Sequence, residues 1–198
     1  PASVVLLHTR DRKQADDPAF VEPLKSATAV WFSGGDQSRI VAAYRGTLVE
    51  KELRNLHARG GVIGGTSAGA AIMSDPMIEG GTENAKLGPG LGLLPGIIVD
   101  QHFNTRKRQA RLAKAVIANP GYVGLGIDED TAVIIRGRFG QVVGESNATT
   151  ILPAGAGKPE LIEVLKKPSK IQPDSLDLFQ LRRAAANRMA KQPFPPRV

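Results

Sequence analysis

Short apolar segments that alternate with helix-like segments constrain the fold of this 198-residue chain more than any other feature. Helical spacing of apolar residues predicts one helix over 38–59 and another over 105–119, with Thr105 as the N-cap of the second. Strands that alternate with helices are typical of a parallel sheet covered on both faces. We therefore predict an α/β fold with a doubly wound, mostly parallel sheet, with buried strands at 3–8, 27–32, 62–63, 97–99 and 122–127.

The remaining segments suggest additions to that sheet. Two short apolar runs, 132–135 and 141–143, predict a β-hairpin, and the Gly- and Pro-rich stretch 75–95 predicts a loop over one face. Residues 158–198 hold nine Lys or Arg against four Asp or Glu, out of a net charge of +7 for the whole chain. We predict a single α/β domain over 1–165 and a basic C-terminal extension over 166–198, with an amphipathic helix at 175–191.

Composition excludes several classes of function. The absence of cysteine excludes disulfides, thiolate metal sites and a cysteine nucleophile. Aromatic residues are only 5% of the chain and do not interleave with basic stripes, so we expect no nucleic-acid partner. No segment approaches the roughly 18 apolar residues of a membrane span. We expect a cytoplasmic protein, with secretion left open because a leader could precede Pro1.

A serine lies in a sequence typical of a nucleophile elbow. Gly65-Thr66-Ser67-Ala68-Gly69 reads G-x-S-x-G and follows a predicted strand directly before a helix. This context allows a sharp turn that exposes the serine hydroxyl, with the N–H of Ala68 directed at a developing oxyanion. The pattern is also compatible with a plain strand-to-helix turn or a phosphate-binding loop. We take Ser67 as a candidate nucleophile.

A serine hydroxyl needs a base at neutral pH, and the chain offers only His8, His57 and His102. His102 directly follows the strand predicted at 97–99, and the carboxyl ends of parallel strands meet at one sheet edge. His57 falls within a predicted helix, on its surface. His8 ends the first predicted strand and is the one rival to His102 as the base.

Polar and basic residues surround His102. Arg106 lies four residues after it and could share its face, although a cluster of arginines is often only a solvated helix surface. Guanidinium groups bind carboxylates through two parallel hydrogen bonds. The cluster therefore suits a charged, peptide-like substrate, and it comprises Asp100, Gln101, Arg106, Lys107, Arg108 and Arg111.

Five motifs in order give the chain a family resemblance over about residues 4–150. They are F-S-G-G-D-Q (32–37), G-G-T-S-A-G-A (64–70), P-G-L-G-L-L-P-G (89–96), D-Q-H-F with R-x-R-x-x-R (100–111), and G-I-D-E (126–129). Together they resemble the cyanophycinase-like serine peptidases, a family that also includes α-aspartyl dipeptidases. The combination is far more specific than any one of its motifs.

The resemblance implies a fold like that of class I glutamine amidotransferases, a flavodoxin-like three-layer sandwich, with serine in place of cysteine. It implies no metal and no cofactor, and a homodimer. The expected activity is that of a serine-type exopeptidase that hydrolyses aspartyl peptide bonds. The expected substrate is cyanophycin, a poly-aspartate with arginine on each side chain, and the expected products are β-Asp-Arg dipeptides.

The resemblance also implies roles for individual residues. Ser67 is similar to the nucleophile, His102 to the general base and Glu129 to the acid that orients the base. In the dipeptidase relatives the acid lies between serine and histidine, where this chain offers Glu79 and Glu83. Gly35 and Ala68 would supply the oxyanion-hole N–H groups. The substrate pocket would comprise Gln37, Asp100, Gln101, Arg106, Arg108 and Arg111.

The chain departs from the family pattern in ways that leave alternatives open. The family opens with an apolar strand and a Gly-rich turn that have no counterpart here, and the 75–88 loop is shorter than usual. We therefore expect the N-terminal part of the family fold to be missing. An α-aspartyl dipeptidase-like activity and a non-catalytic binding module on the same fold both remain open. An α/β-hydrolase esterase is disfavoured, because no histidine follows His102.

Overall fold

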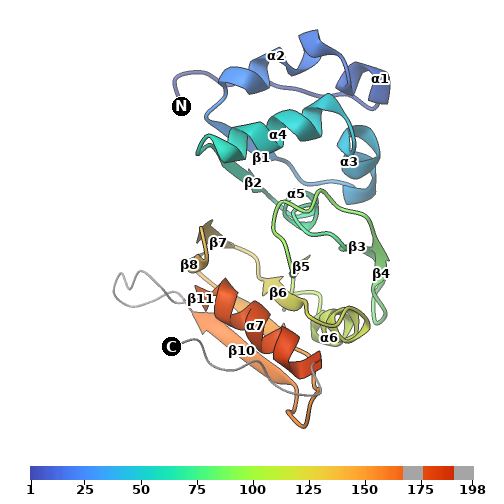
Figure 1. Cartoon of the computed structure of the whole chain (residues 1–198), viewed down its shortest axis with the longest axis vertical. Coiled ribbons are helices and arrows are strands. Elements are labelled where there is room, and N and C mark those ends of the chain that lie inside the picture. Colours follow the sequence, from blue (N-terminus) through green and yellow to red (C-terminus); the bar gives the residue numbers. More distant parts are fainter. Residues whose placement is uncertain (167–175, 190–198) are drawn as a thin grey trace.

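A computed structural model describes residues 1–166 and 176–189. The first part of the chain builds a parallel pair of strands that is covered by helices on one face (Figure 1). β1 (Ala29–Phe32) pairs with β2 (Val62–Gly65), and the elements around them are α1 (Arg12–Ala15), α2 (Pro18–Ser26), α3 (Gln37–Tyr44) and α4 (Leu48–Ala58). Side chains of α2 and α4 pack on Val30, Phe32 and Ile63 to form one core cluster.

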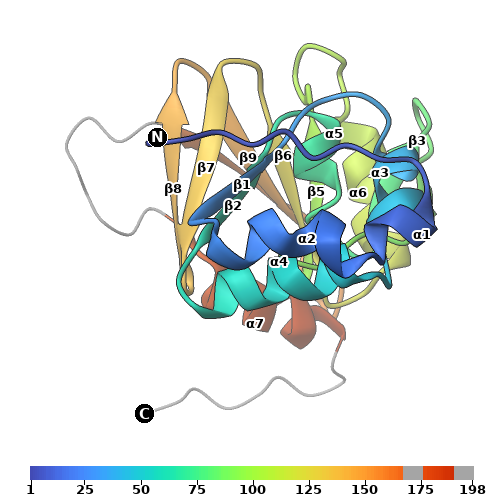
Figure 2. The same cartoon turned by 90° about the horizontal axis from the view of Figure 1, so that it is seen from above.

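The opposite face of this strand pair is exposed. Successive side chains of a strand point to opposite faces, and Trp31 and Val62 on the second face are 67% and 64% exposed. The prediction of a buried strand over 3–8 is wrong: no strand is formed there, and Val4 and Leu6 are 83% and 90% exposed. This segment runs as an extended trace toward α1 (Figure 2). Within the described residues no strand pairs with it, and Leu7 alone among its apolar side chains packs, partly buried, against the core cluster of the strand pair.

The helix predicted over 38–59 is divided into α3 and α4. Gly46 lies at the break with a φ of 73°, a left-handed conformation that costs glycine little, and Thr47 is the N-cap of α4. The Asp16 side chain accepts a hydrogen bond from the Leu48 N–H at 2.8 Å, so it caps the same helix from a distant loop. The helical spacing of apolar residues did not predict this break, because the same spacing continues on both sides of it.

The second part of the chain is a four-stranded mixed sheet in the order β10-β9-β6-β5. Alternate side chains of its strands pack into two different core clusters, one on each face. On one face lies α6, and on the other lie the β7–β8 hairpin and α7, as Figure 1 shows. The elements are β5 (Ile97–Gln101), α6 (Gln109–Ala118), β6 (Val123–Ile127), β7 (Thr131–Arg136), β8 (Phe139–Gly144), β9 (Asn147–Leu152), β10 (Leu161–Lys166), β11 (Leu176–Asp177) and α7 (Leu178–Met189).

The α/β class is confirmed, whereas a mostly parallel sheet is not. Only β1–β2 and β5–β6 are parallel among the pairs formed by the described residues. The predicted hairpin of β7 and β8 is confirmed. The sequence did not predict strands β9, β10 and β11. The predicted 75–95 loop instead contains a small hairpin of β3 (Met77–Gly80) and β4 (Lys86–Gly88), whose turn begins at Gly81 with a φ of 93°, where a Cβ would clash with the Asn84 carbonyl oxygen.

Part of the predicted C-terminal extension belongs to the sheet core. β11 pairs with β8, and Leu178 and Ala185 of α7 are buried in the cluster that includes Ile97 and Val123. The helix predicted at 175–191 is thus found over 178–189, and residues 175, 190 and 191 lie outside the described residues. None of the helices in the described part of the chain is long and apolar enough to cross a membrane.

Candidate active site

Ser67 lies on a sharp turn between β2 and α5 (Ala68–Ala71). Its backbone has φ 54° and ψ −111°, which is strained for a residue with a side chain. Glycine is required on both sides of the turn. A Cβ on Gly65 would lie 2.4 Å from the Gly69 carbonyl carbon, and a Cβ on Gly69 would lie 2.2 Å from the Phe32 carbonyl oxygen. The G-x-S-x-G spacing therefore allows strand and helix to meet closely enough to present the serine.

His102 follows the end of β5, also at a positive φ of 54°. Its Nε2 lies 2.9 Å from the Ser67 Oγ, and its side chain is 29% exposed. The next residue, Phe103, is fully buried and anchors the turn, and its N–H donates to the Ile127 carbonyl at 3.2 Å. A Cβ on Gly126 would lie 2.4 Å from the Phe103 ring, so the glycine of G-I-D-E makes room for the aromatic residue of D-Q-H-F.

Glu129 follows β6 and completes a hydrogen-bonded chain. Its Oε1 lies 2.8 Å from the His102 Nδ1, and its Oε2 accepts a hydrogen bond from the Thr105 hydroxyl at 2.5 Å. Of the three carboxylates considered, Glu129 is the one bonded to the histidine, whereas Glu79 pairs with Lys86 at 3.0 Å. The structure thus brings Ser67, His102 and Glu129 together in one hydrogen-bonded chain. His8 is exposed and lies in the extended N-terminal segment.

The hydrogen bond from Thr105, followed by that from His102, holds the pKa of Glu129 below its ordinary value of 4.5. A carboxyl group with a lowered pKa in the folded state stabilises that state fully above its unfolded pKa, and this contribution is lost as pH falls through the folded value. We expect native protein to be more stable than Glu129→Gln at neutral pH, with the difference shrinking below about pH 4.5. Thermal unfolding of both proteins between pH 3 and 8 measures this. A difference that grew on acidification would contradict it.

Two of the predicted pocket residues form a buried ion pair. Asp100 is fully buried and Arg111 is 3% exposed, and the guanidinium binds the carboxylate through Nε at 2.9 Å and also through Nη2. Arg111 Nη1 also donates to the Gly81 carbonyl at 2.5 Å. The expectation that Asp100 and Arg111 contact substrate directly is not supported by this geometry, because their charges face each other beneath the surface. They join β5 to α6 instead.

The other predicted pocket residues lie nearer the surface. Arg108 Nη1 donates to the Gln101 carbonyl at 2.5 Å and to the Gln101 Oε1 at 3.2 Å, and burial lowers the pKa of Arg108. Arg106 is exposed. Gln37 donates its amide N–H groups to the carbonyls of Ile78 and Glu79 at 3.1 and 2.7 Å, so its donors hold α3 to β3.

The loop after β1 approaches the elbow. A Cβ on Gly34 would lie 3.6 Å from the Ser67 Cβ, and the next residue, Gly35, has a φ of 131° that strongly favours glycine. Ala68 is buried at the first position of α5, where a backbone N–H has no partner within the helix. The two candidate oxyanion-hole residues therefore lie in segments adjacent to the serine.

Sequence reasoning missed the residues that hold the histidine turn in place. Asn104 donates from its side chain and its backbone to the two oxygens of Asp128, at 2.7 and 3.1 Å. Thr105 was predicted as a helix N-cap, but α6 begins later and its N-cap is Arg108. The one sequence feature that could have indicated these residues was the position of Asp128 within G-I-D-E, directly before Glu129.

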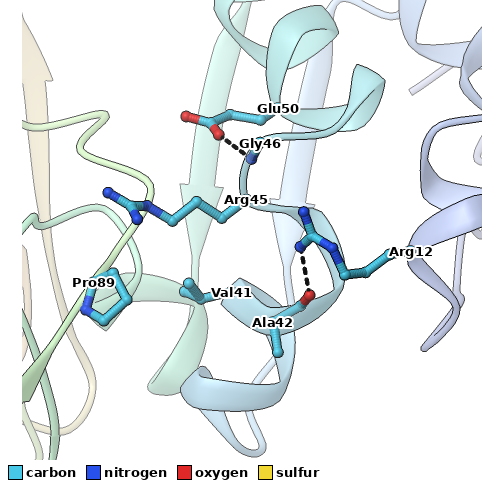
Figure 3. A pocket seen from close by; sticks show the side chains of 7 residues that line it. All are labelled: Arg12, Val41, Ala42, Arg45, Gly46, Glu50 and Pro89. Carbon is cyan, nitrogen blue, oxygen red and sulfur yellow. Dashed lines mark hydrogen bonds between the residues drawn. The ribbon is translucent and has the colours of Figure 1, made fainter.

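A pocket of about 480 Å³ lies apart from this site, between α1, the α3–α4 connection and Pro89 (Figure 3). Its charged groups are bonded within the protein: Arg12 donates to the Ala42 carbonyl at 2.8 Å, and Glu50 accepts from the Gly46 N–H at 2.6 Å. Among residues 1–166 and 176–189, no group of three or more His, Asp or Glu side chains is arranged to hold a metal ion.

A serine on a strained elbow, bonded to a histidine that is bonded to a carboxylate, is the arrangement of serine hydrolases that use a catalytic triad. Comparison with known families gives the narrower class. Residues 2–143 match the family "Peptidase family S51", and the chain belongs to that family.

Similar proteins of known name agree with this class. The chain is 39% identical over 155 residues to a cyanophycinase of Geminocystis herdmanii, which covers 74% of this chain and 57% of the relative. It is 38% identical over 197 residues to a cyanophycinase of Nostoc sp., which covers 89% of this chain and 66% of the relative. The crystal structure of a peptidase from an acI-B1 Actinobacterium superposes with a TM-score of 0.61 at 30% identity, over 80% of this chain and 64% of that one. The chain thus spans less than two thirds of each of these proteins.

Proposed function

We propose that the chain carries the catalytic centre of a serine-type exopeptidase that hydrolyses aspartyl peptide bonds, with cyanophycin as substrate and β-Asp-Arg dipeptides as products. The continuous hydrogen-bonded chain from the Ser67 Oγ through His102 to Glu129 is the observation that carries the reaction type. The substrate rests on the two relatives named cyanophycinase.

In the proposed mechanism the Ser67 Oγ attacks the scissile carbonyl carbon while His102 Nε2 takes the hydroxyl proton. Glu129 stabilises the imidazolium that forms and keeps the ring oriented. The N–H groups of Gly35 and Ala68 would bind the oxyanion of the tetrahedral intermediate. His102 then gives its proton to the leaving amine, and a water molecule deprotonated by the same nitrogen hydrolyses the acyl-enzyme. No step requires a metal ion or a cofactor.

Substrate recognition would use the exposed charges beside His102. Arg106 is exposed four residues after the histidine, and its guanidinium suits a substrate carboxylate. Gln101 and Arg108 are half-buried and bonded to each other, so they would form the wall behind it. Gln37 retains its amide oxygen as an acceptor for a cationic group. In this proposal Asp100 and Arg111 support the pocket from beneath.

The family resemblance supports further proposals of assembly and fold. Parallel pairing on both sides of the elbow, in β1–β2 and β5–β6, supports a doubly wound fold like that of class I glutamine amidotransferases. We also propose a single peptidase domain that includes α7 as well as the predicted residues 1–165, because Leu178 and Ala185 are buried in its core, together with a homodimer and a cytoplasmic location. Size-exclusion chromatography with light scattering would test the dimer.

The deciding experiment incubates the purified protein with cyanophycin and, separately, with α-Asp and β-Asp dipeptides, with product identification by mass spectrometry. Release of β-Asp-Arg from cyanophycin is the expected result. Cleavage of the small α-Asp peptides alone would show that the substrate is that of the aspartyl dipeptidases, and the proposed reaction type would stand. No cleavage of any of them by folded protein would contradict the peptidase and favour a binding module.

A further inference from the structure

The carboxylate of Glu129 is held at both of its oxygens. Oε1 accepts from His102 Nδ1 at 2.8 Å and Oε2 accepts from the Thr105 hydroxyl at 2.5 Å. The Glu129 side chain is 40% exposed, so no tight packing restricts the rotation of its carboxylate. The last torsion of a glutamate side chain is soft. Two hydrogen bonds at fixed points are therefore needed to keep Oε1 in line with the imidazole.

Thr105 is itself held firmly with respect to Glu129. The turn that carries it is fastened to the Asp128 carboxylate by the side chain and backbone of Asn104, and Asp128 is only 6% exposed. The Ser146 hydroxyl donates to the same carboxylate at 3.0 Å. Because Asp128 and Glu129 are consecutive, a fixed Asp128 sets the separation between the Thr105 hydroxyl and the Glu129 side chain. The bond at Oε2 thus joins two segments that are already tied together through Asp128.

We propose that Thr105 is a positioning residue of the proposed peptidase reaction: its hydroxyl fixes the Glu129 carboxylate in the orientation that His102 Nδ1 needs. The inference rests on the proposed function for its kinetic consequence, and on the structure alone for the geometry. The hydroxyl does not touch the reacting atoms. It acts through Glu129, which in turn acts through His102. The hydrogen bond from Thr105 is also the largest cause of the lowered pKa of Glu129.

Thr105→Val removes the hydroxyl and keeps the shape of the side chain, whereas Thr105→Ser keeps the hydroxyl. We expect Thr105→Val to lower kcat about tenfold with little change in KM, and Thr105→Ser to restore most of it. Thr131→Val is the matched control, because the Thr131 hydroxyl donates to the backbone carbonyl of Glu129 at 3.0 Å, accepts from the Ser146 N–H at 3.1 Å and does not bond the Glu129 carboxylate. It should affect stability more than kcat.

Two readouts need no substrate and separate this inference from the proposed function. Titration of the Glu129 carboxyl carbon by NMR should move to higher pH in Thr105→Val and stay in place in Thr131→Val and Thr105→Ser. The downfield resonance of the His102 Nδ1 proton should weaken or shift in Thr105→Val alone. Unchanged spectra together with an unchanged kcat would overturn the proposal. If the native protein lacked hydrolytic activity and the spectra still changed as expected, the proposed function would fail and the positioning geometry would stand.

Discussion

We expect Ser67→Ala to abolish hydrolysis, with kcat lower by roughly 10⁴- to 10⁶-fold and the fold unchanged. The Ser67 Oγ is the only heavy atom removed, and its hydrogen-bond partner is His102 Nε2 at 2.9 Å. Without it the histidine has no hydroxyl to activate and no acyl-enzyme can form. The initial rate of dipeptide release measures this effect, and circular dichroism confirms that the variant is folded. Ser26→Ala, at the end of α2, is the matched control and should retain full activity.

The strained backbone of the elbow gives an independent check of the same site. Alanine keeps a Cβ at φ 54°, so Ser67→Ala retains the strain, whereas Ser67→Gly removes the Cβ and relieves it. We expect both variants to be inactive and Ser67→Gly to be more stable than Ser67→Ala by about 1 kcal/mol, in line with the cost of such backbone conformations. Urea unfolding measures the difference. Substantial hydrolysis by either variant would contradict the assignment of Ser67 as the nucleophile.

Local sequence was enough to predict the serine and the histidine. Ser67 and His102 each directly follow a strand, and side chains at the carboxyl ends of parallel strands converge whatever the details of the loops between them. The acid was less certain, because the sequence offers Glu79, Glu83 and Glu129. Glu129 was favoured because G-I-D-E follows a predicted strand and should lie at the same sheet edge, and the bond to His102 Nδ1 agrees with that choice.

Other features depended on contacts that a sequence does not show. The apolar run at 3–8 has the composition of a buried strand, but composition says nothing about whether a neighbouring strand is present to pair with it. The antiparallel strands β9 and β10 were missed although β9 pairs with β6 and β10 with β9, because neither segment shows the regular apolar–polar alternation of a half-buried strand. The cluster of arginines after His102 suggested a group that faces a charged substrate, and only the fold shows that Arg111 turns inward to Asp100.

The buried pair of Asp100 and Arg111 gives the largest expected effect on stability. Asp100 is fully buried, and its Oδ1 also lies 3.4 Å from the Arg108 Nη1. Asp100→Asn would keep the shape of the side chain and leave two guanidinium groups facing each other with no counter-charge. Breaking a buried ion pair from one side typically costs about 3–5 kcal/mol, because the remaining charge stays desolvated. We expect a loss of this size for Asp100→Asn, measured by urea unfolding.

Removing both charges separates the free-energy cost of one unpaired buried charge from the net contribution of the ion pair to stability. In Asp100→Leu with Arg111→Met, both charges of the pair are removed, Arg108 keeps its bond to the Gln101 carbonyl, and apolar side chains of similar size can pack between β5 and α6. Because replacing a buried pair by apolar residues is often neutral, we expect the double variant to recover most of the stability that Asp100→Asn loses. A double variant less stable than Asp100→Asn would mean that the ion pair itself, including the Arg111 bond to the Gly81 carbonyl, holds β5 in place. His102 follows β5 directly, so recovered stability without recovered activity would show that the pair also sets the position of the histidine turn.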